Sequence, residues 1–338
     1  MRIPFVASAV VGGLLGLGLI AAWGWQRANI GTDGMAATTA LACSSETMPT
    51  AHPGMVWVSG GRFTMGAEYS YVEEGGAHDE EVAGFWMSRT EVTNAEFAAF
   101  VQDTGYVTLA ERGIGNPLDP TATPIPGSAV FKPIIDVNGF NPMNSWWQFV
   151  PGAHWREPQG PGSSIEGLQQ HPVVHIAFED AEAYARWKGQ RLPSEAEFEY
   201  AAQGEGPQDA AGHYTANTWQ GFFPFENDAS DGHLNSSPVG CFTANRFGLH
   251  DLIGNVWEWT ASPFYPGHNF ADKAARPEGY DPLQPEEPAV AVIKGGSFLC
   301  AANYCMRYRP EARQGQSKGL GTSHIGFRTV LDAAPPSQ

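Results

Sequence analysis

The fold is decided by residues 171–202, HPVVHIAFEDAEAYARWKGQRLPSEAEFEYAA. The first eight, HPVVHIAF, form a short and mostly apolar run, which predicts a buried strand over residues 171–178. The next stretch, EDAEAYARWKG, predicts a helix that ends at Gly189, because glycine readily adopts the left-handed conformation that closes a helix. Ser194 and Glu197 have the spacing of a capping box and predict the start of a second helix.

The flanking segments extend this pattern in both directions. Thr93 and Glu96 repeat the capping-box spacing before an apolar stripe, and Gly105 can end that helix. MVWVSGGRFTMG at residues 55–66 alternates around a Gly-Gly pair, which predicts a hairpin where the domain begins. Residues 204–288 contain no long periodic element. We therefore expect one α+β domain with sparse regular secondary structure and long loops.

Composition limits the classes of protein to consider. The chain has 338 residues, 42% of them hydrophobic, with 11 Trp and 19 Phe, which is enough to fill a sizeable core. Its 40 Gly and 26 Pro favour a fold rich in turns over a helical bundle. The formal net charge of −17 would repel a phosphate backbone, so we expect no nucleic-acid partner.

An apolar segment near the amino terminus predicts contact with a membrane. Residues 3–25, flanked by Arg2 and Arg27, are long enough to span a bilayer as a helix. A cleaved signal peptide is the alternative, although no A-x-A-like site follows directly, and ALAC ending at Cys43 faintly resembles a lipoprotein site. In each case we expect an extracytoplasmic domain, periplasmic or at the cell surface. We interpret residues 3–25 as an uncleaved membrane anchor.

These observations divide the chain into four parts. Residues 1–27 are interpreted as a membrane anchor or signal segment, and residues 28–54, which are small, polar and aperiodic, as a linker. We expect residues 55–332 to form the single folded domain and residues 333–338 to be a tail.

Two cysteines near the carboxy end carry the strongest chemical signal. Cys300 and Cys305 lie in VIKGGSFLCAANYCMRYRPEAR, where Arg307 and Arg309 follow them. The spacing is too wide for a zinc knuckle, and no second pair completes a tetrahedral thiolate site. A structural disulfide fits this spacing. Two thiolates also suit a soft monovalent ion such as Cu(I), and nearby guanidinium groups would favour the thiolate form.

Several separate stretches together resemble the formylglycine-generating enzyme, or sulfatase-modifying factor, family. The matching segments run from about residue 55 to residue 330 and are GGRFTMG, EVTNAEFAAFV, HWREPQGPGSSI, HPVVHIAFEDAEAYARWKGQRLPSEAEFEYAA, HYTANTWQGFFP, GLHDLIGNVWEWT, KGGSFLCAANYCMRYR and IGFR. The resemblance implies a single C-type-lectin-like fold. It also implies that Cys300 and Cys305 are Cu(I) ligands and that Ser297 lies beside the same pocket.

The resemblance further implies an enzyme, an oxidoreductase that acts on a sulfur group with oxygen as acceptor. Its partner would be a client sulfatase polypeptide bearing a C-x-P-x-R motif, whose cysteine becomes formylglycine. The reaction would consume O2 and need an external reductant. A cleft that accepts a peptide arginine is also implied, and the net acidity of the chain agrees with it.

Two calcium sites are implied in the same way, because Ca²⁺ requires hard oxygen ligands. Acidic turns are usually only solvated, so these residues alone would not predict a calcium site. The expectation rests on the family resemblance. The ligand sets are Asn217, Thr218, Asp231 and His233 for one site, and Asp251, Gly254, Val256 and Glu258 for the other.

Other attractive residues have plainer interpretations. On a strand, the side chains of His171 and His175 would be separated by roughly 13 Å and could not share one ion, so both are interpreted as structural. A group of three tryptophans could line a peptide cleft or fill the core. This group is Trp146, Trp147 and Trp155. Cys43 and Cys241 have no evident partner and are interpreted as non-catalytic.

The chain departs from the family pattern between Ser317 and His324, with His324 in place of a usual Asn. This puts substrate choice and the redox step in question. A rival hypothesis is a lectin-like binding or scaffold module in which Cys300 and Cys305 form an inert disulfide. Iron-dependent sulfoxide synthases share the fold, but the chain is too short for their additional helical domain.

Overall fold

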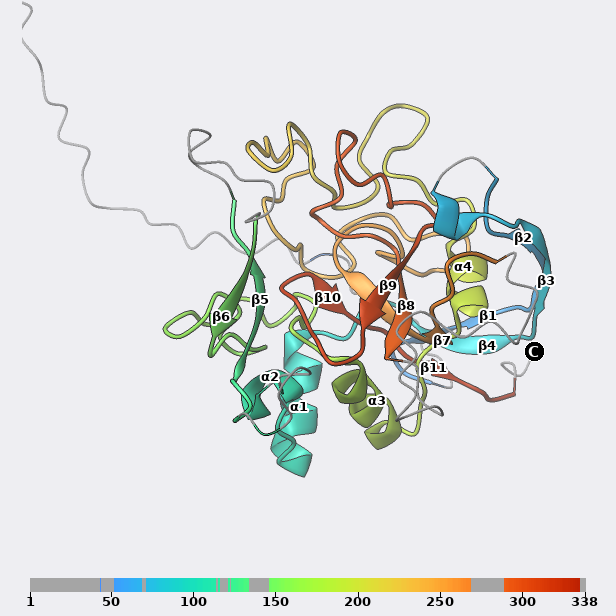
Figure 1. Ribbon diagram of the computed structural model, residues 1–338. Helices are drawn as coiled ribbons and strands as arrows, with labels where there is room; N and C mark the ends of the chain where they lie inside the picture. The colour runs from blue at the N-terminus through green and yellow to red at the C-terminus, as the bar shows by residue number, and fades with distance from the viewer. Residues whose placement is uncertain are drawn as a thin grey trace, which may run out of the picture. The chain divides into compact units, whose positions relative to one another are not determined.

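Small sheets joined by long loops carry the regular structure (Figure 1). In the described part of the chain, the four-stranded sheet has the order β10-β7-β8-β9, a three-stranded sheet has the order β1-β4-β11, and β2-β3 and β5-β6 form pairs. The strands are β1 Met55–Val58, β2 Gly61–Met65, β3 His78–Val82, β4 Phe85–Ser88, β5 Gly127–Phe131, β6 Trp147–Pro151, β7 Trp257–Pro263, β8 Val290–Lys294, β9 Arg313–Ser317, β10 Ile325–Gly326 and β11 Val330–Leu331. The helices are η1 Val72–Glu74, α1 Asn94–Thr104, α2 Leu109–Arg112, α3 Phe178–Trp187 and α4 Glu195–Ala202. The expected α+β character with sparse regular structure is confirmed.

The structure is a computed structural model. It describes residues 43, 52–68, 71–113, 115, 121, 123–133, 146–268 and 289–334. The apolar segment at 3–25 and most of the linker lie outside these residues, so the predictions for them stay predictions. Among the described residues, no helix is both long enough and apolar enough to cross a membrane.

The capping signals located α1 and α4 correctly, whereas α2, which has the same box at Thr108 and Glu111, was not predicted. At the start of α1, the Thr93 hydroxyl accepts from the Glu96 backbone N–H at 3.2 Å and the Glu96 carboxylate accepts from the Thr93 N–H at 2.9 Å. Ser194 and Glu197 exchange the same pair of bonds before α4. Gly105 closes α1 in the left-handed conformation, as predicted.

The predicted hairpin at residues 55–66 is wrong. Strand β1 pairs with β4, and β2 pairs with β3, so the two strands belong to different sheets. At Gly60 the chain passes so close to the backbone of residues 82–84 that a Cβ would have no room. The Gly-Gly pair therefore lets the chain pass from one sheet to the next, which local sequence cannot distinguish from a turn.

The strand predicted at residues 171–178 is also wrong, because only an isolated bridge between Thr93 and Pro172 forms there. His175 has a φ of 62°, and its ring is held by Nε2, which donates to the Pro158 carbonyl at 2.9 Å, and by Nδ1, which lies 2.8 Å from Ser128 Oγ. A left-handed residue in mid-segment ends the extended run.

Strand β7 was missed in the stretch where no periodic element was expected. Its first four residues are all buried, so the alternation that marks a half-exposed strand is absent. Because the alternation is absent, the sequence did not predict this strand, which lies between β10 and β8 in the four-stranded sheet. We call this four-stranded sheet the central sheet.

The core joins the helices to this sheet. Phe97 of α1 stacks with Tyr184 of α3, with ring centroids 6.0 Å apart. The same cluster of buried side chains contains Trp257 of β7 and both Cys300 and Cys305. The cysteines therefore lie in the wall of the core.

Buried ion pairs attach α4 to the central sheet. Lys294 donates to Glu199 at 2.7 Å, and Arg313 donates to both carboxylate oxygens of Glu195. His268 lies close enough to these two glutamates for a shared metal ion. The two cations already balance both carboxylates, which argues against a metal at this position.

Candidate functional site

The two candidate cysteines lie in one tight loop after β8. The Cys300 N–H donates to the Ser297 carbonyl at 2.8 Å, and the Cys305 N–H donates to the Ala301 carbonyl at 3.0 Å. Gly296, with a φ of 76°, lets the loop begin, since a Cβ there would collide with the Arg307 carbonyl. These contacts bring the two sulfur atoms to 2.9 Å as free thiols in hydrogen-bond contact.

The two thiols ionise differently although they are neighbours. A hydrogen bond from Cys300 lowers the pKa of Cys305 to about 7, with help from Arg307. Burial raises the pKa of Cys300 well above its usual value, and the contact with Cys305 adds to this. The pair therefore holds one proton on Cys300 and presents a thiolate at Cys305 near neutral pH.

Arg307 is itself held in place. Its guanidinium lies over the ring of Tyr71, 3.8 Å from the centroid, and forms an ion pair with Glu73. The expected second cation, Arg309, instead pairs with buried Glu74 at 2.9 Å. Arg307 is therefore the cation that favours the Cys305 thiolate, so the sequence-based expectation is confirmed for one of the two arginines.

Both sulfur atoms face a cavity of about 300 Å³. No Asp or Glu is among its lining residues, so its ligand atoms are soft sulfurs and neutral polar groups. Residues that line it are Ala129, Trp146, Trp147, Phe223, Trp257, Ser297, Leu299, Cys300, Tyr304, Cys305, Arg307, Gln314, Gln316, Leu320, Thr322 and His324. Of the three candidate tryptophans, Trp146 and Trp147 line this cavity, whereas Trp155 is buried in the core.

His324, the divergent residue, lies in this cavity beside Ser297. Its Nδ1 is 3.4 Å from the Ser297 hydroxyl, and its ring meets Trp147 edge to face at 4.7 Å. Burial lowers the pKa of His324 to about 3, so the ring is neutral at physiological pH. A neutral imidazole can accept the Ser297 proton at Nδ1, and Ser297 is thereby brought into the site as expected.

Comparison with known proteins identifies the relatives of this chain. Residues 42–333 match the family described as "Sulfatase-modifying factor enzyme 1-like domain". The chain belongs to this family. It is 47% identical over 295 residues to the formylglycine-generating enzyme of Mycobacterium tuberculosis, covering 82% of this chain and 97% of that one.

Two further relatives show the breadth of the sulfatase-modifying factor family. The "Inactive C-alpha-formylglycine-generating enzyme 2" of Mus musculus is 35% identical over 302 residues, covering 85% of this chain and 88% of that one. The solved structure of PvdO from Pseudomonas aeruginosa superposes with a TM-score of 0.53 at 27% identity, covering 82% and 93% of the two chains. The expected family fold is therefore confirmed.

The thiol cavity fits a soft metal ion. Its two sulfurs converge, one of them is readily deprotonated, and the lining offers no carboxylate that a hard cation would prefer. Cys300 and Cys305 are the residues that would hold Cu(I).

The first calcium set of the family is brought together. The Asp231 carboxylate accepts from the Thr218 N–H at 3.0 Å and from the His233 N–H at 2.9 Å. The Gln220 amide nitrogen contacts three oxygens at once, which are the Thr218 carbonyl, the Thr218 hydroxyl and the Asp231 carboxylate. Asn217 Oδ1 is buried without a partner. The oxygens of Thr218 and Asp231 therefore converge on the Gln220 amide, and the Asn217 oxygen is a separate acceptor without a partner. Such hard oxygen atoms suit Ca²⁺.

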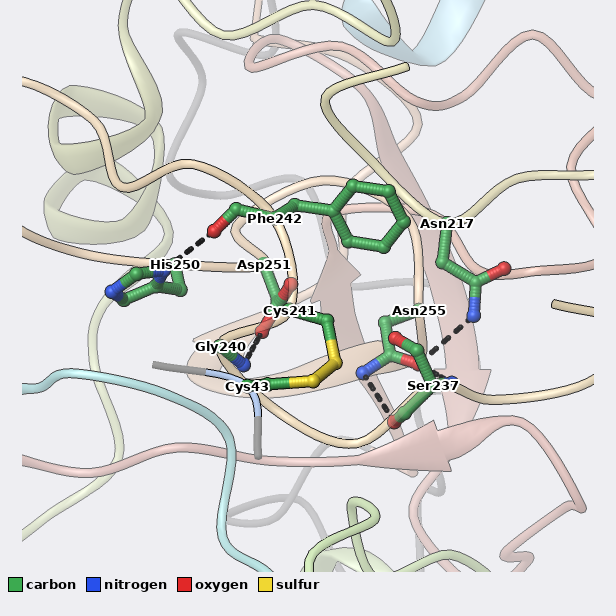
Figure 2. The surroundings of a disulfide bond; sticks show 9 residues. All are labelled: Cys43, Asn217, Ser237, Gly240, Cys241, Phe242, His250, Asp251 and Asn255. Atoms are coloured by element: carbon green, nitrogen blue, oxygen red, sulfur yellow. Dashed lines mark hydrogen bonds between the residues drawn. A yellow bond between two sulfur atoms is a disulfide. The ribbon is translucent and has the colours of Figure 1, made fainter. Parts of the chain in front are cut away.

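The second calcium set does not fit in this structure. Both oxygens of Glu258 accept from Arg328, at 2.7 Å each, so a buried cation already balances this carboxylate. Asp251 has one oxygen bonded to the Gly240 N–H at 2.6 Å and the other buried without a partner (Figure 2). Gly254 and Val256 lie between them in the sequence. Arg328 therefore replaces the expected cation as the partner of Glu258.

A disulfide joins Cys43 to Cys241, a pairing that sequence reasoning missed (Figure 2). It ties the chain just before the predicted domain start to the loop whose Gly240 N–H holds Asp251. One signal could have found it, since Cys300 and Cys305 were assigned together and an extracytoplasmic location favours pairing the remaining two.

The two candidate histidines lie in separate environments. The His171 ring bonds Ser236 Oγ at 3.0 Å, whereas the His175 ring bonds Ser128 and Pro158. Burial lowers the pKa of each to about 4, so both are neutral. These contacts agree with a structural interpretation.

Proposed function

We propose that this protein oxidises a cysteine of a client sulfatase to formylglycine, with Cu(I) held by Cys300 and Cys305 and with O2 as oxidant. The observation that carries the proposal is the pair of free thiols, 2.9 Å apart on the wall of a cavity, in a member of the sulfatase-modifying factor family. Relatives named formylglycine-generating enzyme support the reaction.

In the balanced reaction, one cysteine side chain, one molecule of O2, two electrons and two protons give one aldehyde, one hydrogen sulfide and one water. The two electrons come from an external reductant, and the carbon–sulfur bond breaks so that the sulfur leaves as sulfide. When bound, Cu(I) would supply a redox centre that accepts a further thiolate and reacts with oxygen.

The protein's own residues prepare this site. Arg307 and the Cys300 proton stabilise the Cys305 thiolate, so a soft ion meets one ligand that is already charged at neutral pH. Ser297 and His324 place a hydroxyl and a neutral imidazole on the cavity wall. The Trp146 and Trp147 rings would limit water around a substrate side chain.

The client is proposed to be an extended peptide with a C-x-P-x-R motif. Its cysteine would enter the cavity lined by Trp146 and Tyr304, whose rings meet edge to face at 5.2 Å. The net charge of −17 favours approach of the motif's arginine.

We extend the proposal to calcium and location. Asn217, Thr218, Asp231 and His233 would hold one structural Ca²⁺ ion, supported by the unpartnered Asn217 oxygen. Residues 3–25 would anchor the domain outside the cytoplasm, and the Cys43–Cys241 disulfide is in keeping with an oxidising compartment.

The rival hypothesis is a binding module with an inert Cys300–Cys305 bridge. A relative that is 35% identical and is named inactive supports this alternative. The free thiols of this structure favour the oxidase, because an inert bridge would leave no ligand for the metal.

The test combines metal binding with product analysis. Purified protein should bind about one Cu(I) per chain, and a C-x-P-x-R peptide should lose the mass that corresponds to aldehyde formation while O2 is consumed. Cys305→Ser should abolish both, whereas Cys241→Ser, which removes a cysteine that does not line the cavity, should retain copper binding. Peptide conversion by Cys305→Ser at the wild-type rate would refute the proposal.

A further inference from the structure

Asn255, which lies just before β7, connects two segments that hold the loop of the candidate cysteines. We call residues 295–305 the thiol loop. Asn255 is 0% exposed and has a φ of 49°. It is not among the residues that line the thiol cavity, so it does not contact a ligand there. Any effect of Asn255 on copper binding must therefore act through its neighbours.

The backbone at Asn255 holds the first part of the thiol loop. The Asn255 carbonyl accepts from the Phe298 N–H at 2.9 Å, and the Gly254 N–H donates to the Gly295 carbonyl at 2.9 Å. Both bonds lie on the part of the loop that precedes Cys300. They therefore set the path by which the chain reaches that cysteine.

A second segment, residues 217–219, holds the loop at Cys300 itself. The Trp219 N–H donates to the Cys300 carbonyl at 3.0 Å, and Trp219 pairs with Ala301 in a parallel bridge. The Ala301 carbonyl accepts from the Cys305 N–H at 3.0 Å. The backbone positions of both cysteines therefore depend on this segment.

Asn255 connects the two segments to each other. Its N–H donates to the Asn217 carbonyl at 2.8 Å. Its Oδ1 accepts from the Asn217 amide at 3.3 Å and from the Ser237 N–H at 2.9 Å (Figure 2). Its Nδ2 donates to Glu91 Oε1 at 3.0 Å. A buried network in which each polar group has a partner restricts the chain to one arrangement.

The residue type suits this position. A φ of 49° lies in the left-handed region, which Asn adopts more readily than most residues that carry a Cβ. Glycine would also adopt this backbone, but it has no amide to bond Glu91 and Ser237. Asn255 therefore combines the required backbone with the required side chain.

We propose that Asn255 is a positioning residue for copper binding. By connecting the segments that hold the thiol loop, it keeps the Cys300 and Cys305 sulfurs at the separation that a shared ion requires. The inference rests on the proposed function, because it concerns the same two thiols. Replacing residues that orient metal ligands from behind typically lowers metal affinity by about 10–100-fold.

Asn255→Gly is the main variant, because glycine keeps the left-handed backbone and removes only the side-chain bonds. Anaerobic competition with a chromophoric Cu(I) chelator, on the full chain, should show a dissociation constant raised about tenfold. Asn245→Ala is the matched control. The Asn245 side chain bonds Ala201, Phe247 and Leu249, all outside the thiol loop, so its copper affinity should equal that of wild type.

Amide hydrogen exchange supplies a readout that does not involve copper. In metal-free Asn255→Gly, peptides that cover residues 295–305 should exchange about tenfold faster than in wild type, whereas peptides that cover α1 should be unchanged. Equal acceleration of both would mean a global loss of stability and would overturn a positioning role.

A milder variant covers the case in which Asn255→Gly does not fold. Asn255→Asp keeps the left-handed backbone and an oxygen that accepts from Ser237 and Asn217, but it cannot donate to Glu91. Because one of the connections is lost, its copper affinity should fall about threefold, between those of wild type and Asn255→Gly. Wild-type affinity in Asn255→Asp, with Asn255→Gly unfolded, would overturn the proposal.

The remaining outcomes separate this inference from the proposed function. Copper binding by wild type and by folded Asn255→Gly with equal affinity would overturn the positioning role alone. An equal loss of affinity in Asn245→Ala would do the same, because the effect would then not be specific to the thiol loop. No copper binding by wild type would overturn the oxidase proposal and this inference together.

Discussion

Arg328 donates two hydrogen bonds of 2.7 Å to the Glu258 carboxylate, deep in the protein. This arrangement makes Glu258 part of an ion pair. Because the Arg328 guanidinium already balances this carboxylate, a change at Glu258 should affect folding stability without affecting calcium.

Glu258→Gln should lower the free energy of unfolding by about 1.5–3 kcal/mol, because the buried Arg328 loses its charge-assisted hydrogen bonds and keeps Glu91, 4.0 Å away, as its remaining ion-pair partner. Calcium should still raise the melting temperature of this variant by the same amount as in wild type. Thermal unfolding with and without Ca²⁺ measures both. A lost calcium response would place Glu258 among the ligands after all.

Asp231→Asn should show the opposite pattern. Saturating Ca²⁺ should stabilise the wild type by about 2.7 kcal/mol at a hundredfold excess over its dissociation constant. The variant weakens the carboxylate that lies among the converging oxygens, so this increment should largely vanish while stability without calcium changes little. An unchanged increment would argue against a calcium site here.

Alkylation of the metal-free protein should report the unequal thiols. Cys305 should react with iodoacetamide with a midpoint at about pH 7, because only its thiolate is nucleophilic and the thiolate fraction rises with pH. Cys300, whose pKa is raised, should react only at much higher pH. Peptide mapping by mass spectrometry separates the two.

Arg307→Gln is the matched variant for that measurement. Removing the guanidinium removes one cause of the lowered pKa, so the Cys305 midpoint should move upward. An Arg309→Gln control should leave it in place, since Arg309 pairs with Glu74 and Glu311. Equal shifts in both variants would mean that the effect is not local.

His324→Asn should keep most of the activity, because an amide oxygen can still accept from the Ser297 hydroxyl. His324→Leu removes the acceptor and should lower kcat/KM about tenfold, which corresponds to roughly 1.4 kcal/mol. The pH profile from 5 to 9 should show no ionisation of His324, whose pKa is lowered to about 3. Comparable kcat/KM values for the Leu variant and wild type would contradict a positioning role.

Helices α1 and α4 were predictable because their signals are local. The capping boxes at Thr93 and Ser194 involve residues three positions apart, and both formed as expected. The hairpin at residues 55–66 failed because strand partners are chosen by distant segments. Strand β7 was hidden because burial on both faces removes its alternation.

In the site, too, local features were predictable and contacts between distant segments were not. The close approach of Cys300 and Cys305 depends on one loop and could be expected from their spacing and family resemblance. The Glu258–Arg328 pair spans 70 positions and the Cys43–Cys241 bond spans 198, so neither has a local signature. The paired cysteines were therefore easier to predict than the residues that surround them.

The disulfide between Cys43 and Cys241 also affects how proteolysis could release the domain from the segment before residue 43. A protease that cut between residues 44 and 54 would nick the chain, yet the sulfur bridge would keep the two pieces together. Shedding would require a cut before residue 43, or a cut after it together with a reductant. On a reducing gel such a nicked protein would separate into two fragments, and on a non-reducing gel it would migrate as one.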